Sequence, residues 1–185
     1  MNPVGTQDAE TRRKGNVKER ISAQALGDAV LEALEQGDTA ARAASLSAIP
    51  AEGDAAALLA MLAAAQGADD PAARAAALDR LDALAGDPAL RPVYRDLAIL
   101  KSVLLRGEDL APQDRIDRLA PLTAPGAPYR ALALEATAHA HVAAGDSEAA
   151  LAVLSDLLAD SEATQGLRRR ATQLIVALGG SVEAG

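Results

Sequence analysis

Apolar residues recur along most of this chain at spacings of three and four, the pattern of a helix with one face against a core. Near the C-terminus they form one continuous stripe, Leu167, Ala171, Leu174, Ile175 and Leu178. Glycine, proline and aspartate interrupt the pattern at intervals, which predicts short helices joined by tight turns. The predicted helices span residues 17–36, 39–47, 54–66, 71–85, 92–106, 112–120, 128–144, 147–159 and 164–178.

Four Gly-Asp pairs mark predicted turns: Gly37-Asp38, Gly53-Asp54, Gly86-Asp87 and Gly145-Asp146. A glycine just past a helix end accepts the left-handed backbone conformation, and the aspartate then caps the exposed N–H groups of the next helix. This repeated stop and restart indicates helices folded back on one another. Proteins built from such hairpins generally offer extended binding surfaces.

The predicted hairpin turns at Gly37, Gly67, Gly107 and Gly145 lie 30, 40 and 38 residues apart. These intervals straddle the tetratricopeptide period of about 34 residues. We therefore predict an all-α fold, a right-handed α-solenoid of tetratricopeptide-like helical hairpins, with residues 164–178 as a C-terminal capping helix. The repeat domain is predicted over residues 16–180, after a disordered N-terminal arm (1–15) and before a frayed tail (181–185).

Composition supports the all-α prediction and excludes sites that depend on cysteine. The chain has 47 Ala and 27 Leu, both strong helix formers, and no Phe, Trp or Cys. An alanine-rich core predicts helices that approach one another closely. The absence of cysteine excludes disulfides, zinc–thiolate sites and thiol nucleophiles.

The charge of the chain is acidic and unevenly distributed. A formal net charge of −8 argues against nucleic-acid partners, which require a basic face. Residues 1–20 carry net +2, which leaves −10 for the rest, so this basic arm either lies beside a membrane surface or is a solvated tail. Apolar stretches such as 55–65 are too short to span a bilayer, so we predict no membrane span in this chain.

No residue pattern predicts catalysis, a metal site or a cofactor. His139 and His141 are the only histidines, and side chains two apart on a helix point about 200° from each other, so they do not chelate one metal. The carboxylates at turn positions are explained by helix capping. These are Asp38, Asp54, Asp70, Asp87 and Asp146. We therefore expect a protein that is not an enzyme, without catalytic, metal-binding or cofactor-binding residues.

Three consecutive arginines, Arg168, Arg169 and Arg170, lie near the start of the last predicted helix. The segment lacks the spaced glycines and the lysine of a phosphate-binding loop. A run of three covers nearly a full helical turn and therefore does not face one partner. We interpret the run as surface ion pairing with nearby carboxylates, at Asp156, Asp160 and Glu162, in preference to an anion site.

The two tyrosines, Tyr94 and Tyr129, follow Pro92 and Pro128 at the starts of two predicted helices. Each ring either packs between adjacent hairpins, the interpretation we favour, or lines a concave groove, where aromatic and arginine side chains dominate binding energy. Basic residues nearby complete the candidate partner-binding set. This set is Arg91, Tyr94, Arg95, Lys101, Tyr129 and Arg130.

Several segments resemble a known family, the alphaproteobacterial tetratricopeptide-like proteins of the YfgM type, which are ancillary subunits of the SecYEG translocon. The resemblance covers roughly residues 20–180 and is clearest over 84–180. The segments that carry it are Asp87-Pro88-Ala89-Leu90, Tyr94-Arg95-Asp96-Leu97-Ala98, Leu119 to Tyr129 (LAPLTAPGAPY), and Gly166 to Ala171 continuing through Leu174 and Ala177-Leu178.

The resemblance implies an inner-membrane protein with one N-terminal membrane helix and a periplasmic repeat domain that contacts client or envelope proteins. It brings no catalytic residues. No membrane helix precedes Val17, so we expect the periplasmic side of the inner membrane if an anchor has been removed, and the cytoplasm otherwise.

Together, these observations predict a non-catalytic protein-interaction scaffold or chaperone-like module. Two alternatives stay open. One is a self-associating structural subunit of a larger complex, and the other is a helical domain that binds a small ligand or acts as an enzyme.

Overall fold

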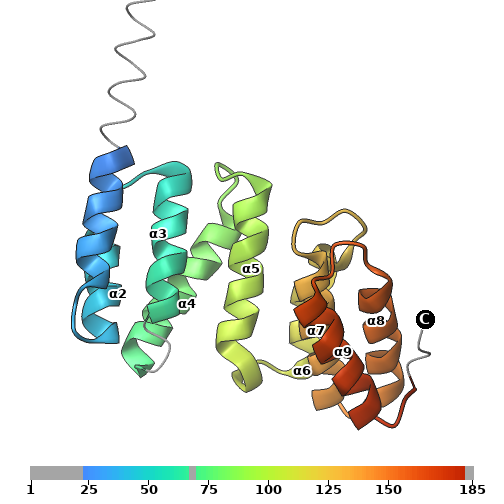
Figure 1. Ribbon diagram of the computed structural model, residues 1–185. Coiled ribbons are helices and arrows are strands. Elements are labelled where there is room, and N and C mark those ends of the chain that lie inside the picture. Colours follow the sequence, from blue (N-terminus) through green and yellow to red (C-terminus); the bar gives the residue numbers. More distant parts are fainter. Residues whose placement is uncertain (1–22, 67–69, 182–185) are drawn as a thin grey trace, which may run out of the picture. The chain divides into compact units, whose positions relative to one another are not determined.

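A computed structural model describes residues 23–66 and 70–181, and these residues form helices and turns without a strand (Figure 1). The all-α prediction is therefore confirmed. Residues 23–34 are helical. The following helices are α2 (Thr39–Ala48), α3 (Gly53–Gln66), α4 (Pro71–Gly86), α5 (Pro92–Arg106), α6 (Pro112–Leu119), α7 (Arg130–Ala143), α8 (Ser147–Ala159) and α9 (Gln165–Ala177), with short 3-10 turns η1 (Gly107–Asp109) and η2 (Ala120–Thr123).

Most predicted helix boundaries agree with these spans to within one residue, and α5 and α8 agree at both ends. Proline explains the start of α5. Pro92 is its first residue, where an N–H group would have no partner within the helix, so the missing N–H of proline costs no hydrogen bond. The predicted arm (1–15), the start of the first helix, the turn at Gly67 and most of the predicted tail lie outside the described residues.

The chain divides into two compact units, Met1–Arg74 and Ala75–Gly185. In the first unit, α2 packs against α3, and both share a core with the helix at residues 23–34. In the second unit each of the helices α5 to α9 contacts the next one along the chain. Consecutive helices from α5 to α9 therefore pack on one another, as in hairpins, and so do α2 and α3. The solenoid stacking, its handedness and the single repeat domain over 16–180 stay predictions.

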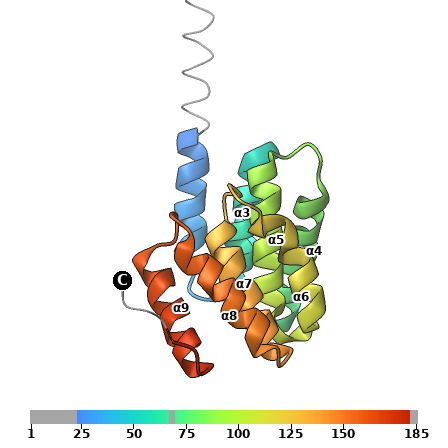
Figure 2. The ribbon, with the colours of Figure 1, turned by 90° about the vertical axis from the view of Figure 1, so that its right-hand side faces the viewer.

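Helix α7 is the central helix of the second unit, because it contributes to two separate cores. Ala133 joins a cluster with residues of α5, α6 and η2. Ala131, Leu134 and Ala138 join a second cluster with α8 and α9. Figure 2 shows the ribbons of these three helices. Alanines of α7 thus belong to both clusters. The apolar stripe on α9 also belongs to this second cluster.

The end of α7 uses glycine as the sequence predicts. At the end of α7, Gly145 has φ +78°, its N–H bonds to the Val142 carbonyl at 3.0 Å, and the Asp146 N–H bonds to the His141 carbonyl at 2.9 Å. This pair of bonds is the Schellman motif. Asp146 then caps α8 by accepting from the Ala149 N–H at 3.0 Å, so the Gly-Asp pair ends one helix and starts the next.

At Gly37 and Gly86 the prediction of a left-handed glycine is wrong, since neither has a positive φ. The end of α4 is tightened instead by a bond from the Asp87 N–H to the Leu84 carbonyl at 3.3 Å, a geometry that needs no left-handed residue. At Gly53 φ is +55°, but this glycine begins α3 and does not follow a helix end. Four identical dipeptides therefore have different local structures.

Candidate protein-interaction surface

Arg91 and Tyr94 form a stacked pair at the start of α5. The guanidinium carbon of Arg91 lies 4.8 Å from the centre of the Tyr94 ring, and its Nη2 donates to the Tyr94 hydroxyl at 2.8 Å. A cation over an aromatic face is attracted by the electron density of the ring. The pair therefore presents a flat aromatic surface held in place by an exposed arginine.

Tyr129 is the N-cap residue of α7, and its half-buried side chain packs against the cluster that includes Leu100 and Leu122. Burial, the negative charge of Asp96 and the neighbouring Tyr94 raise the pKa of the Tyr129 hydroxyl above its ordinary value. The structure thus brings the two tyrosines into one electrostatic environment.

The equivalent placement predicted for the two tyrosines is wrong in detail. Tyr94 lies inside the first turn of α5, whereas Tyr129 precedes α7, which begins two residues later than predicted. The later start of α7 has a local cause. Gly126 has φ +80°, and the Arg130 N–H bonds to the Ala127 carbonyl at 3.1 Å, so Pro128 belongs to the turn and not to the helix.

Arg95 and Lys101 are both half-buried on α5 but lie on different faces. Arg95 precedes Ser102 by seven residues, so it shares the face from which the Ser102 hydroxyl donates to Asp82 of α4 at 2.8 Å. Lys101 follows Tyr94 by seven residues and shares the tyrosine's face. Among the described residues, no carboxylate forms an ion pair with either cation.

The face that carries Tyr94 and Lys101 also carries two leucines, Leu97 and Leu104. Spacings of three, four and three residues place these four side chains in one stripe along α5, which we call the α5 face. Leu104 is 59% exposed, and the other three side chains are half-buried. The leucines were not among the predicted site residues, although the same 3–4 spacing that predicts the helix could have identified them.

Arg130, the sixth candidate, belongs to a different environment. Its Nε donates to the Thr123 carbonyl at 3.0 Å, and its Nη1 forms an ion pair with Asp160, whose side chain is only 8% exposed. The Glu162 N–H also donates to Asp160, at 2.8 Å. This backbone bond and the bond from Arg130 lower the pKa of the Asp160 carboxyl below its ordinary value.

The three arginines of α9 have three separate roles. Arg168 donates to backbone carbonyls of Leu158, Asp160 and Ala163, and therefore fixes the end of α8 and the turn that follows it. Arg170 holds Glu135 of α7 in a two-bond pair at 2.6 and 2.9 Å. Arg169 is exposed. Ion pairing is confirmed for Arg170, but its partner is on another helix, and the carboxylates proposed from the sequence do not pair with Arg168.

A second polar cluster joins α4, α5 and α6 around Asp82. Its carboxylate accepts from Ser102 at 2.8 Å and from Arg106 at 2.5 and 3.1 Å, and Arg118 lies 3.7 Å away. Burial alone would raise the pKa of Asp82, but the hydrogen bonds from Arg106 and Ser102 outweigh it and lower the pKa. Ser102 is therefore held as a structural hydrogen-bonding group.

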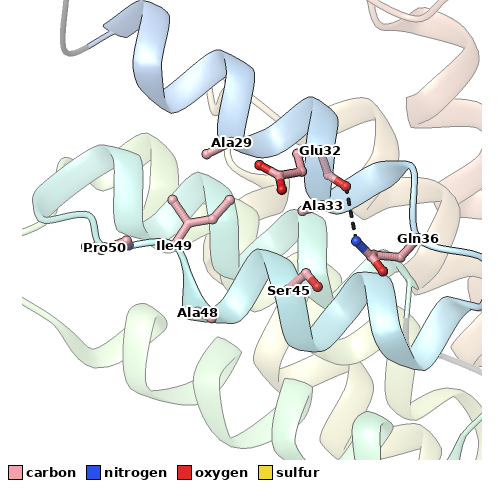
Figure 3. A pocket seen from close by; sticks show the side chains of 8 residues that line it. All are labelled: Ala29, Glu32, Ala33, Gln36, Ser45, Ala48, Ile49 and Pro50. Atoms are coloured by element: carbon pink, nitrogen blue, oxygen red, sulfur yellow. Dashed lines mark hydrogen bonds between the residues drawn. The ribbon is translucent and has the colours of Figure 1, made fainter.

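The first unit contains a hollow of about 280 Å³ between residues 29–36 and the end of α2 (Figure 3). The polar side chains at its rim are Glu32, Gln36 and Ser45, and Ile49 provides an apolar wall. The Gln36 amide makes only a long 3.5 Å bond to the Glu32 carbonyl. Exposed, loosely held polar groups of this kind do not make a preorganised ligand site.

A hollow of about 360 Å³ in the second unit is lined by residues 125–127, by Arg130 and by residues 159–162. Its most buried charges, Arg130 and Asp160, already neutralise each other.

Both histidines lie on α7. His139 is exposed and His141 half-buried. In the part of the chain that the structure describes, no three His, Cys, Asp or Glu residues are placed to hold a metal ion. Across residues 23–66 and 70–181, no helix combines the length and apolarity needed to cross a bilayer.

Comparisons of the chain with protein-family models, with curated proteins and with solved structures found no match in any of the three. The resemblance to YfgM-type proteins therefore rests on its sequence motifs alone.

Proposed function

We propose that this protein is a non-catalytic interaction module that binds a segment of another protein on the surface of its helical hairpins. The observation that carries the proposal is the α5 face, on which an aromatic ring, two leucines and a cation without a described counter-charge lie in one stripe. Tyrosine is enriched at protein-binding surfaces, and the mostly exposed Leu104 adds apolar area that a partner would cover.

The other polar clusters of the second unit support this choice because their groups already have partners. Asp82 is bonded by Ser102 and Arg106, and Asp160 is paired with Arg130. These bonds join helices, and the Ser102 hydroxyl, although it donates to a carboxylate, belongs to a residue that is only 1% exposed. The α5 face differs, since Lys101 has no described partner and Leu104 is mostly exposed.

Site-specific photo-crosslinking in the native host tests the proposal. A photoreactive residue at Leu104 should give a dominant adduct with another protein. The matched control is Leu132 of α7, another exposed leucine of the same unit at 41% exposure. Equal adducts at both positions, or none at Leu104, would contradict binding on the α5 face.

The compartment is a separate part of the proposal and rests on the resemblance to YfgM-type proteins. That resemblance implies a partner among translocon or other envelope proteins at the periplasmic side of the inner membrane. Membrane fractionation with protease accessibility in spheroplasts tests this. Membrane association with cleavage from the periplasmic side supports the assignment, and a protected cytoplasmic protein overturns it.

The alternative of a self-associating subunit is favoured by one observation, the exposure of Val176 on α9, at 62%. Sedimentation of the purified chain over a wide concentration range tests it. Mass growth that Val176→Ser abolishes would support this alternative.

A further inference from the structure

We infer that the partner segment recognised by the α5 face is an acidic amphipathic helix of another protein. This inference deepens the proposed function and depends on it. It names the chemistry of the partner from the charge and shape of the surface.

The shape of the α5 face suits a helix. Tyr94, Leu97, Lys101 and Leu104 follow one line along α5 over residues 94–104, and a second helix carries side chains at the same three- and four-residue intervals. A partner with large apolar residues at those intervals covers Leu97 and Leu104. The Arg91–Tyr94 stack closes one end of the line with a rigid aromatic surface.

The charge of the α5 face identifies the partner as acidic. Acidic residues outnumber basic residues 26 to 18 in the whole chain, yet the one charged side chain of the stripe, Lys101, is basic. Asp96 lies two residues from Tyr94 and therefore points about 200° away from it, and its charge acts on Tyr129. The stripe itself thus has positive charge and no carboxylate.

Lys101 is half-buried, and lysine generally covers apolar surface with its alkyl stem while its ammonium group reaches solvent. A carboxylate of a bound partner can meet the ammonium group there. Among the described residues nothing supplies that negative charge. A carboxylate of the partner placed at the middle of the stripe supplies it and fixes the register of the helix.

A pair of synthetic peptides of about 18 residues, long enough to form helix on binding, tests the inference. Both carry leucine at helical intervals, and the remaining positions carry mostly glutamate in one peptide and mostly lysine in the other. Fluorescence anisotropy with the purified chain should show saturable binding of the glutamate peptide, weakened by salt, and no binding of the lysine peptide. Equal binding of the two peptides, or no binding of the glutamate peptide, overturns the inference.

Charge reversal locates the binding. Lys101→Glu should weaken the glutamate peptide by about tenfold or more, since it places like charges opposite each other. Lys101→Gln should give a smaller loss. Arg169→Glu is the matched control, because Arg169 is an exposed cation on α9 and should leave the affinity unchanged. Circular dichroism melting of each variant verifies that it folds. Equal losses from Lys101→Glu and Arg169→Glu would show non-specific charge attraction and overturn the inference.

The two levels of the proposal fail separately. A protein adduct at Leu104 without binding of the glutamate peptide would keep the interaction function and reject the acidic helix. Sedimentation of the purified chain alone tests whether a second copy of this chain, and not another protein, binds on the α5 face. Self-association that Lys101→Glu abolishes would replace the proposed partner with that copy.

Discussion

Two groups of basic side chains in the second unit differ in whether they bond to other segments of the chain. On α9 and at the start of α7, the guanidinium groups of Arg168, Arg170 and Arg130 bond to carbonyls or carboxylates of other segments. On α5, Lys101 and Arg95 are half-buried and have no described ion-pair partner. The first group holds helices together, whereas the second is available to another molecule. The same residue types thus stabilise the fold in one region and present a surface in the other.

The largest expected effect comes from removing a structural arginine. Arg168→Ala leaves the carbonyls of Leu158, Asp160 and Ala163 without their charged donor. We expect the free energy of unfolding to fall by roughly 2–3 kcal/mol, as for charge-assisted hydrogen bonds. Urea denaturation measures it. Arg169→Ala is the control and should stay within about 0.5 kcal/mol of the parent. Similar losses for both would remove the distinction between bonded and exposed arginines.

A substitution at Gly180 tests how tightly the C-terminal helices are packed. A Cβ atom there would lie 2.8 Å from side-chain atoms of Ile175 and Leu151. Gly180→Ala should therefore lower the free energy of unfolding by about 1–2 kcal/mol, as overpacking does. In Gly166→Ala, near the start of α9, the new Cβ has only ordinary contacts, at 3.7 Å and beyond, so this control should cost little. Thermal melting that ranks the two variants in the opposite order would contradict the close packing of α9 on α8.

Acid should weaken the Arg130–Asp160 pair. Because the pKa of folded Asp160 lies below its unfolded value, the ionised carboxyl stabilises the fold at neutral pH. That stabilisation is present above about pH 4 and is lost as the pH falls through the folded pKa. Asp160→Asn should therefore lower stability at pH 7 and flatten its decline in acid. Denaturation at a series of pH values measures this, with Asp156→Asn, an exposed carboxylate of α8, as the control.

The smallest effect on stability is expected on the α5 face. Lys101→Gln removes a charge that has no described partner, so the free energy of unfolding should change by no more than about 0.5 kcal/mol. Urea denaturation of Lys101→Gln and Arg168→Ala under the same conditions compares the two losses of unfolding free energy. A loss as large as that of Arg168→Ala would show that Lys101 is structural and would reassign the α5 face to the fold.

Helix positions follow from the sequence because they depend on local chemistry. Pro92 fixes the start of α5, and Gly145 with Asp146 fixes the turn from α7 to α8. The same dipeptide at Gly86-Asp87 gave a wrong prediction of backbone conformation. The backbone hydrogen bonds that end the helix decide whether the glycine is left-handed. A dipeptide alone does not specify which of these bonds form.

The candidate site was only partly predictable, because its contacts join separate helices, whereas helix boundaries depend on neighbouring residues. The structure keeps Arg91, Tyr94 and Tyr129 in one region, but it assigns Arg130 to Asp160, 30 residues away in the chain. Pairs such as Arg170 with Glu135 also join separate helices. Partners at such separations depend on how helices pack, and residue spacing along the sequence carries no signal for them.

The most direct test of the account is photo-crosslinking at Leu104 in the native host, in the parent chain and in Lys101→Glu. The account predicts one dominant protein adduct in the parent, with acidic residues in the crosslinked segment, and its loss in Lys101→Glu. An adduct that is no stronger at Leu104 than at Leu132, or that persists unchanged in Lys101→Glu, would contradict the assignment of the α5 face as the interaction surface.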